Sequence, residues 1–346
     1  MRVLITGGAG FLGSFTAQRR LADGDQVWST RFEGAGGNQN QTPGVKTIAC
    51  DVTVPEELEQ AIDESEPDLI FHFAAQTFIG ESWADPKRTL ITNCLGTVNL
   101  LEILRTKCSQ ATVVIACSSA EYGEVAGRGA PVQETDPLRP VSPYGLSKLD
   151  QDILGYLYFR THGLRVIRAR IFNTIGPGKR GDFLADFCQQ ITVIEAGKAE
   201  PFLRTGELNS RRDLTDVRDT VAALDLLAKR GAAGEAYNVC SGQTIRIGDV
   251  VTLLMAVAGR QIKIQVEGSR LRPFEESVIW GDNKKLIART GWSPQISLGQ
   301  TVKDTLDYWR ERAADGGLRT DRILNAAMVE ESRTKSGEQI VGPAQS

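Results

Sequence analysis

The sequence predicts an α/β fold in which helices cover both faces of a parallel sheet, with a smaller α/β lobe after it. Apolar runs of strand length alternate with helical patterns through the first two-thirds of the 346 residues. These runs are continuously apolar, which is typical of parallel strands buried on both faces. The first run is followed at once by a glycine-rich turn and a helix. Together these three features predict a Rossmann-type, doubly wound parallel sheet.

The expected elements follow one another in a regular order. Strands are expected at Val3–Thr6, Gln26–Thr30, Val45–Ala49, Leu69–Phe73, Val113–Cys117 and Val166–Arg170. Helices are expected between them at Phe15–Asp23, Glu56–Ser65 and Thr89–Lys107. Residues 1–175 are therefore expected to form the sheet domain, and a later segment at about 212–240 is expected to return to it.

The pattern becomes less regular after about residue 175, where Gly-Pro-Gly at 176–178 interrupts the chain. Further elements are expected at Asp182–Glu195, Ala236–Val239, Ile247–Ala258, Lys263–Val266 and Leu298–Ala313. Residues 176–313 are thus expected to form mainly a lobe that binds substrate. Residues 314–346 are polar and carry no periodicity, so a flexible tail is expected there.

Composition excludes several classes of protein. A net charge of −3 gives no reason to expect a nucleic-acid partner. No apolar run approaches the ~18 residues that cross a bilayer, and the first residues lack a signal-peptide body, so no membrane partner and a cytoplasmic location are expected. The six cysteines are scattered and only two histidines are present, so no metal site and no Ser-His-Asp hydrolase are expected.

The glycine-rich turn predicts a cofactor site. Its residues are Gly7, Gly10, Phe11, Leu12 and Gly13. Glycines are needed where the backbone turns sharply, approaches a phosphate, and packs helix on strand. The helix N-terminus offers unpaired N–H groups and a partial positive charge to an anion. The turn is therefore expected to bind the pyrophosphate of a nicotinamide dinucleotide.

Residues at the ends of later strands indicate whether the dinucleotide is NAD(H) or NADP(H). An NAD site usually carries an acid after the second strand, but no Asp or Glu stands there before Glu33. Arg31 suits a 2′-phosphate, so NADP(H) is favoured and NAD(H) stays possible; the alternative for Arg31 is a plain surface cation. Asp51 and Val52 are expected near the adenine. Small residues, Ala74 and Ala75, are expected to let the dinucleotide lie close.

Two residues four apart, Tyr144 and Lys148, are candidates for the chemistry. Residues at i and i+4 share one face of a helix, and a nearby ammonium is expected to lower the pKa of the phenol. Tyr144 is then a general acid or base for a carbonyl or hydroxyl, and both side chains are expected to contact the cofactor, Lys148 at the nicotinamide ribose. A serine follows the strand expected at Val113–Cys117, where its hydroxyl can bond the reacting oxygen.

With these motifs in this order, the chain resembles the extended short-chain dehydrogenase/reductases that act on nucleotide sugars. The resemblance covers roughly residues 1–312. Beside the glycine turn and Tyr-x-x-x-Lys, it rests on the segments Leu138–Gly145, Phe172–Gly178, Arg212–Val217, Tyr237–Gly242 and Leu271–Glu275. Within the family the chain looks most like members that reduce a GDP-bound 4-keto-6-deoxyhexose. This resemblance implies NAD(P)H-dependent reduction of the C4 ketone, giving a GDP-rhamnose-type product.

The resemblance also implies roles for single residues. Ser119, Tyr144 and Lys148 form the expected catalytic triad; Ser118 competes for the serine's place and is otherwise expected to contact the substrate. Related 4,6-dehydratases carry Thr-Asp-Glu or Thr-Ser-Glu at this strand end, where this chain is interpreted as Ser119-Ala120-Glu121. Alanine cannot donate a proton, but Glu121 stays a catalytic candidate. A nucleotide-sugar 4,6-dehydratase or 4-epimerase with retained NAD(P) is therefore the alternative.

A nucleotide-diphosphate sugar, with GDP favoured by the resemblance, requires cations for its phosphates. The expected substrate contacts are Arg272 and Arg212 to phosphate, Asn173 to phosphate or sugar, and Glu275 to a ribose hydroxyl or to Arg272. In this family two helices, here near Thr89–Lys107 and Pro143–Phe159, commonly form a dimer interface. A homodimer is therefore expected, with Leu95, Val98 and Leu154 as interface candidates that are equally able to face the sheet.

Overall fold

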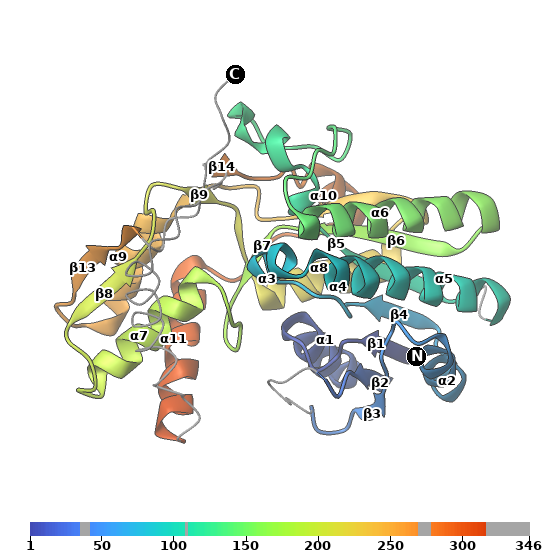
Figure 1. Cartoon of the computed structure of the whole chain (residues 1–346), viewed down its shortest axis with the longest axis horizontal. Helices are drawn as coiled ribbons and strands as arrows, with labels where there is room; N and C mark the ends of the chain where they lie inside the picture. The colour runs from blue at the N-terminus through green and yellow to red at the C-terminus, as the bar shows by residue number, and fades with distance from the viewer. Residues whose placement is uncertain (35–41, 108–109, 269–277, 316–346) are drawn as a thin grey trace. The chain divides into compact units, whose positions relative to one another are not determined.

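The fold is described from a computed structural model, which defines residues 1–34, 42–107, 110–268 and 278–315. The described residues form two compact units (Figure 1). The larger contains Met1–Ile175, Ser210–Ile245 and residues 278–298, and the smaller contains Gly176–Asn209, residues 246–268 and residues 299–315. Within these residues no helix combines the length and the apolar character needed to cross a membrane.

Seven parallel strands form the central sheet of the larger unit. They are β1 (Arg2–Thr6), β2 (Gln26–Arg31), β3 (Lys46–Ala49), β4 (Leu69–His72), β5 (Thr112–Ser118), β6 (Arg165–Ile171) and β11 (Ala236–Val239). Their order across the sheet is β11-β6-β5-β4-β1-β2-β3, and each neighbouring pair is parallel. The direction of winding reverses between β1 and β4. The predicted doubly wound, Rossmann-type sheet is confirmed.

Helices cover both faces of this sheet because successive strand residues point to opposite sides. In β1, Val3 and Ile5 pack with residues of α1 (Phe11–Ala22) and α8 (Val217–Arg230), whereas Leu4 packs on the opposite face. That second face is covered by α2 (Pro55–Ser65), α5 (Gly96–Lys107) and α6 (Pro143–His162). Figure 1 shows α5 and α6 side by side along the sheet.

The helix expected at Thr89–Lys107 is interrupted in the structure. It consists of α4 (Pro86–Leu90), a π-helical turn η1 (Ile91–Leu95) and α5, and a short helix α3 (Ile79–Ala84) precedes it. The π turn accommodates one extra residue, and such turns are frequent at functional sites. Here it contains Asn93, whose side chain bonds Gln76 and donates to the Ser147 hydroxyl oxygen on α6 at 2.8 Å.

The remaining described elements of the larger unit are short. They are η2 (Ser119–Glu121), η3 (Gly123–Arg128), β7 (Asn173–Ile175), β9 (Arg211–Arg212), β10 (Leu214–Asp216), β12 (Ile245–Arg246), β14 (Val278–Ile279) and α10 (Lys284–Thr290). β7 pairs in parallel with β10, and β14 pairs in parallel with β9. β7 directly follows β6 in the chain. These short strand pairs belong to the larger unit but not to its main sheet.

The smaller unit contains α7 (Phe183–Glu195), β8 (Phe202–Thr205), α9 (Ile247–Ala258), β13 (Lys263–Val266) and α11 (Leu298–Ala314). β8 and β13 form a parallel pair, and α7 packs on β8 and α9. Arg310 of α11 forms a two-pronged ion pair with Glu195 of α7, at 2.9 and 2.6 Å. The tail expected at 314–346 lies outside the described residues from residue 316 on.

Candidate active site

The glycine turn connects β1 to α1 where the sheet's winding reverses. Gly7 has a φ of +69°, and a Cβ there would lie 2.9 Å from the Ala74 backbone. A Cβ on Gly13 would lie 2.5 Å from the Gly7 carbonyl oxygen. The amide of Gly10 donates to the same oxygen at 2.9 Å and closes the turn. Glycine is therefore required at positions 7 and 13 on steric grounds.

The turn fits the pyrophosphate of a dinucleotide. Gly10 is the N-cap of α1 and supplies no side chain to cap it, and the N-terminus of a helix favours an anion. Phe11 opens the helix, and Leu12 packs against the sheet core. The Thr30 hydroxyl on β2 accepts from the Gly7 amide at 3.1 Å, which ties the turn to the end of the second strand.

Arg31 ends β2, next to Thr30. Its Nε is buried and has no hydrogen-bond partner among the described residues, and its Nη2 lies 3.9 Å from Glu33 Oε1. Such a guanidinium retains donors for a phosphate. Its position fits the expected contact with a 2′-phosphate.

The other expected cofactor residues lie along the same edge of the sheet. Asp51 shapes the loop after β3, since its Oδ1 accepts from the amide and hydroxyl of Thr53 at 2.9 and 2.8 Å. Val52 packs its side chain in the core, so that side chain is not presented to a ligand. The amide of Ala74 donates to the Thr6 hydroxyl at 3.2 Å, and Ala75 follows it half-buried.

Helix α6 carries Tyr144 and Lys148 and begins against the end of β5. Ser142 caps the helix by accepting from the Gly145 amide at 3.0 Å, and Pro143 occupies the first turn, as is common at a helix start. A Cβ on Gly145 would lie 2.6 Å from the carbonyl oxygen of Ala120. Glycine therefore allows the first turn of α6 to touch η2, which brings Tyr144 close to Ser118.

Lys148 is held inside the protein by two acceptors. Its Nζ donates to the Ala116 carbonyl oxygen at 2.8 Å and to Gln151 Oε1 at 2.7 Å. It lies 5.9 Å from the centre of the Tyr144 ring. Burial lowers the pKa of Lys148 to about 8, because the ammonium loses its hydration.

The pKa of the Tyr144 phenol differs from the expected one. Burial raises its pKa to about 12, and a hydrogen bond with the Ser118 hydroxyl acts in the opposite direction. Lys148 does not offset the burial, because its ammonium bonds other acceptors and lies beside the ring. The expectation that this ammonium holds the pKa of the phenol down is therefore wrong, and Tyr144 is a protonated donor at neutral pH.

A chain of buried hydrogen bonds leads from Lys148 to the glycine turn. Gln151 Nε2 donates to the Thr97 hydroxyl oxygen at 2.6 Å, and His72 Nε2 lies 3.1 Å from the same oxygen. Thr97 donates its own proton to a backbone carbonyl at 2.7 Å, so His72 must donate through Nε2. His72 Nδ1 then accepts from Thr6, the residue before Gly7, at 2.8 Å.

The side chains of this chain beyond Lys148 were not among the residues expected at the site. They are Gln151, Thr97, His72 and Thr6. Burial lowers the pKa of His72 to about 3, so the imidazole is neutral and its tautomer is fixed by its two partners. The sequence feature that could have indicated them is a polar residue where an apolar one is expected. Thr6 and His72 end apolar strands, and Gln151 lies one turn after Lys148; all three are buried. Which of them meet depends on tertiary packing.

Of the two candidate serines, Ser118 interacts with the hydroxyl of Tyr144. β5 continues one residue beyond its expected end at Cys117, so Ser118 is its last residue and Ser119 begins η2. The Ser118 hydroxyl oxygen accepts from the Ala120 amide at 3.2 Å, so its proton remains available for another acceptor. This interaction favours Ser118, the competing candidate, over Ser119, and the choice of catalytic serine stays a prediction.

Glu121, expected as a catalytic candidate, is turned into the protein. It is 0% exposed, and its Oε1 accepts from the Ser118 amide at 2.7 Å. Its Oε2 lies 3.5 Å from Nε of Arg170 on β6. The carboxyl group is therefore engaged with the Ser118 amide and with Arg170 and is closed off from solvent.

The expected substrate residues lie at separate places. Asn173 begins β7 and is half-buried, and Arg212 lies on β9, where its Nη1 donates to the Arg211 carbonyl oxygen at 2.9 Å. Arg272 and Glu275 lie outside the described residues. Within the described part of the chain, one group of three possible metal ligands occurs: Cys117, Glu121 and Asp152. Arg170 already pairs with both carboxylates of that group, so the group is not a vacant cation site.

The sheet, the glycine turn, and the Ser-Tyr-Lys set at the ends of β5 and α6 define an NAD(P)-dependent enzyme of the extended short-chain dehydrogenase/reductase class. More narrowly, the chain belongs to the GDP-mannose 4,6-dehydratase family, whose sequence profile matches residues 4–305.

The chain is similar in sequence to a reductase, and in fold to two solved structures. The GDP-6-deoxy-D-mannose reductase of Pseudomonas aeruginosa is 36% identical over 250 residues, covering 72% of this chain and 82% of that protein. The solved structure of RMD from Pseudomonas aeruginosa, complexed with NADPH, has a TM-score of 0.78 at 32% identity and covers 90% of this chain and 100% of that chain. The Thermus thermophilus UDP-glucose 4-epimerase complexed with NAD has a TM-score of 0.80 at 30% identity, covering 90% and 99%.

Proposed function

We propose that this enzyme reduces the C4 ketone of a GDP-4-keto-6-deoxyhexose to a GDP-rhamnose-type product, with NADPH as the favoured reductant. The similar reductase of Pseudomonas aeruginosa supports this activity. The observation that carries the proposal is Ala120. With Ser118 beside Tyr144, the run at this strand end is Ser118-Ser119-Ala120, and alanine stands where the related dehydratases carry glutamate. Elimination of water from the sugar lacks a proton-transferring side chain at that position.

The chain's own groups supply the acid chemistry of the reduction. When bound, the cofactor supplies the hydride that the carbonyl carbon accepts. Tyr144, protonated because burial raises its pKa to about 12, transfers its proton to the developing alkoxide oxygen. Ser118 donates its free hydroxyl proton to the same oxygen and stabilises the charge. The Lys148 ammonium adds a positive charge beside the tyrosine ring and holds the nicotinamide ribose.

NADPH rather than NADH is supported by Arg31 and by the absence of an acid at the end of β2. Replacing Arg31 by Ala is expected to weaken NADPH binding by about 10- to 100-fold, which is the loss of one charge-assisted phosphate contact, and to leave NADH binding within about threefold. Fluorescence titration with both cofactors measures this. Equal losses for the two would remove Arg31 from the 2′-phosphate.

Substrate binding is proposed to use Arg212 and Arg272 for the diphosphate, Asn173 for phosphate or sugar, and Glu275 for a ribose hydroxyl. The guanidinium fork matches phosphate oxygens. Guanine as the base is supported by the similar reductase. UDP-sugars are the natural comparison, because a similar solved structure is a UDP-glucose 4-epimerase.

The second candidate function is a nucleotide-sugar 4,6-dehydratase or 4-epimerase with retained NAD(P), which the likeness to the NAD-bound epimerase supports. A panel of nucleotide sugars, with NADPH and with NADH, separates the two. The reductase consumes one NADPH for each GDP-4-keto-6-deoxymannose. Turnover of GDP-mannose or UDP-glucose without added cofactor would instead establish the second function. Tyr144→Phe is expected to abolish turnover while NADPH binding is kept, since only the phenolic proton is lost.

A homodimer and a cytoplasmic location complete the proposal. Exposed apolar side chains gather on η1 and α6: Ile91, Leu95, Ile153, Tyr156 and Leu157 are 40–46% exposed. Of the interface candidates, Leu95 is exposed, Val98 is partly buried, and Leu154 packs against the core instead. The location is supported by the five described cysteines, which form no disulfide.

A further inference from the structure

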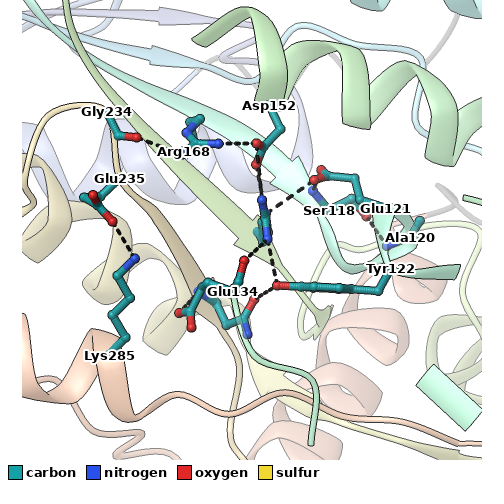
Figure 2. Close-up of polar contacts among 12 residues, drawn as sticks. Ser118, Ala120, Glu121, Tyr122, Glu134, Asp152, Arg168, Gly234, Glu235 and Lys285 are labelled. Carbon is teal, nitrogen blue, oxygen red and sulfur yellow. Dashed lines mark hydrogen bonds and ion pairs between the residues drawn. The ribbon is translucent and has the colours of Figure 1, made fainter. Parts of the chain in front are cut away.

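A cluster of buried charges lies directly behind the proposed catalytic serine. At its centre is Arg170 on β6, whose Nε and Nη2 donate to Asp152 at 2.9 and 3.3 Å. Its Nη1 donates to the Tyr122 hydroxyl and to the Glu134 carbonyl oxygen, both at 3.0 Å. Its Nε also lies 3.5 Å from Glu121 Oε2. Figure 2 shows Asp152, Glu121, Tyr122 and Glu134 gathered around one guanidinium.

A second arginine, Arg168, pairs with the same Asp152 and donates to the Gly234 carbonyl oxygen at 2.7 Å. We call Glu121, Tyr122, Asp152, Arg168 and Arg170 the Arg170 cluster. Glu121 and Asp152 are 0% exposed, and Tyr122 is also fully buried. Burying so many charges is costly unless they are paired, so their retention at this place suggests a role beyond filling the core.

The cluster joins the elements that carry the proposed catalytic groups. Asp152 lies on α6, four residues after Lys148 and eight after Tyr144, on the same helix face. Glu121 is the last residue of η2, which follows Ser118 directly. Arg170 connects the two through its contacts with Asp152 and Glu121. Arg170 therefore links the segment that carries Ser118 to the helix that carries Tyr144.

Glu121 makes the contact that reaches the serine itself. Its Oε1 accepts the Ser118 amide proton at 2.7 Å, while the Ser118 hydroxyl oxygen accepts the Ala120 amide proton at 3.2 Å. The two bonds form a reciprocal capping box that fixes both the backbone and the side chain of Ser118. Figure 2 shows Ser118, Ala120 and Glu121 in this arrangement. The remaining freedom of the hydroxyl is the direction of its proton, and Tyr144 lies beside this hydroxyl.

We propose that Glu121 is a positioning residue, which holds the Ser118 amide so that the serine hydroxyl stays directed at the reacting oxygen beside Tyr144. The other oxygen of the carboxyl group lies 3.5 Å from Nε of Arg170, which Asp152 holds in place. The effect on turnover rests on the proposed function, but the effect on the Ser118 amide does not. The role differs from acid–base catalysis, because Glu121 is enclosed and bonded to the backbone.

Two substitutions of Glu121 differ in whether the side chain can still accept a hydrogen bond. Burial, with Asp152 nearby, raises the pKa of Glu121, because both disfavour its ionised form. Glu121→Gln preserves the size of the side chain and an acceptor oxygen for the Ser118 amide. Glu121→Met preserves the length of the side chain and removes the acceptor. A purely space-filling role tolerates both variants to a similar degree.

The test combines these variants with Ser118→Ala in a double-mutant cycle. Glu121→Met is expected to lower kcat by about 10- to 100-fold with little change in KM, as for a catalytic group displaced by about 1 Å. In the Ser118→Ala background the same change is expected to lower kcat by less than about threefold, because the hydroxyl to be positioned is gone. Glu121→Gln is expected to retain most of kcat.

Amide hydrogen exchange of Ser118, measured by NMR on the full chain with NADPH, reads the same contact without turnover. Faster exchange in Glu121→Met, but not in Glu121→Gln, supports the proposal. Equal kcat losses in both Ser118 backgrounds, or unchanged exchange in Glu121→Met, would overturn it. If the wild type reduces no nucleotide sugar, the proposed function fails while the exchange result still decides the role of Glu121.

Discussion

Two adjacent serines with different environments decide how the site is interpreted at the scale of single residues. Ser118 ends β5 and interacts with the Tyr144 hydroxyl, and its own hydroxyl oxygen accepts from the Ala120 amide at 3.2 Å. Ser119 begins the next turn, and its carbonyl oxygen accepts from the Tyr122 amide at 3.1 Å. The same chemical group is thus available at both positions, but only one of the two adjoins the phenol.

Ser118→Ala is therefore expected to lower kcat by about 10²- to 10³-fold, the usual cost of removing one donor to a developing oxyanion. Ser119→Ala, which removes a hydroxyl of the same type one residue along, is the matched control and is expected to stay within about threefold. Steady-state kinetics with saturating NADPH measure both. A larger loss in Ser119→Ala than in Ser118→Ala would return the catalytic role to Ser119.

Gln151 provides a pH-dependent prediction, because its Oε1 accepts from the Lys148 ammonium. Burial lowers the pKa of Lys148 to about 8, so the ammonium is present below that pH and is lost as the pH rises through it. Removing an acceptor disfavours the cation, so Gln151→Leu moves the decline of kcat/KM to lower pH. Gln151→Glu adds a negative charge and moves it to higher pH.

Other groups around Lys148 are the same in both Gln151 variants, which makes the comparison informative. They are Tyr144 on its own helix, Cys94 on η1, Cys117 on β5, Glu121 on η2 and His72 on β4. Burial also raises the pKa of Glu121, so the direction of the shift is the readout rather than the pH of the decline. Shifts of the same sign in Gln151→Leu and Gln151→Glu would contradict this assignment.

At the scale of elements, the strands of the sheet were predicted closely because each is a continuous apolar run. β5, for example, extends only one residue beyond each end of the expected Val113–Cys117. The same short difference affects the choice between Ser118 and Ser119, because side chains alternate along a strand and the direction changes where the strand ends. The π turn at Ile91–Leu95 was not predicted, since one inserted residue hardly alters the apolar spacing of a long helix.

Contacts between distant elements could not be predicted from the spacing of residues. The i and i+4 relation of Tyr144 and Lys148 is correct, but the direction of the ammonium is set by Ala116 on β5 and by Gln151. Likewise, the sequence offers no indication that Glu121 faces Arg170 on β6. Both contacts depend on how α6 packs against the sheet, so the periodicity of the sequence does not predict them.

Asp152 offers a prediction about how α6 is fixed to β6. It pairs with Arg168 and Arg170, whose side chains are 11% and 5% exposed, and its own side chain is fully buried. Asp152→Asn leaves two buried cations without their main counter-charge, so it is expected to destabilise the fold by about 3–5 kcal/mol. Urea unfolding monitored by fluorescence measures this loss.

The matched control is Glu235→Gln, which weakens an ion pair with Lys285 between side chains that are 52% and 37% exposed. Its expected cost is below about 1 kcal/mol, because water and salt screen exposed charges. If Asp152→Asn costs no more than Glu235→Gln, the Arg170 cluster does not stabilise the fold through charge pairing.

At the scale of the whole molecule, the described contacts concentrate the chemistry in the larger unit. The glycine turn, the Lys148–His72 chain and the Arg170 cluster all belong to it. The elements that hold this machinery also carry the apolar face on η1 and α6. If a second copy covers that face, association buries surface on the helix that carries Tyr144 and Lys148, and so stabilises it.

The proposed dimer gives the last prediction. Ile153 and Leu157 lie four residues apart on α6 and are 43% and 46% exposed. Replacing both by Glu brings two like charges into the apolar contact on each side, so the double variant is expected to be a monomer by light scattering. Ile264→Glu on β13, at a position 48% exposed, is the control for surface charge and is expected to keep the wild-type mass. A monomeric wild type, or a double variant that remains dimeric, would exclude this face as the interface.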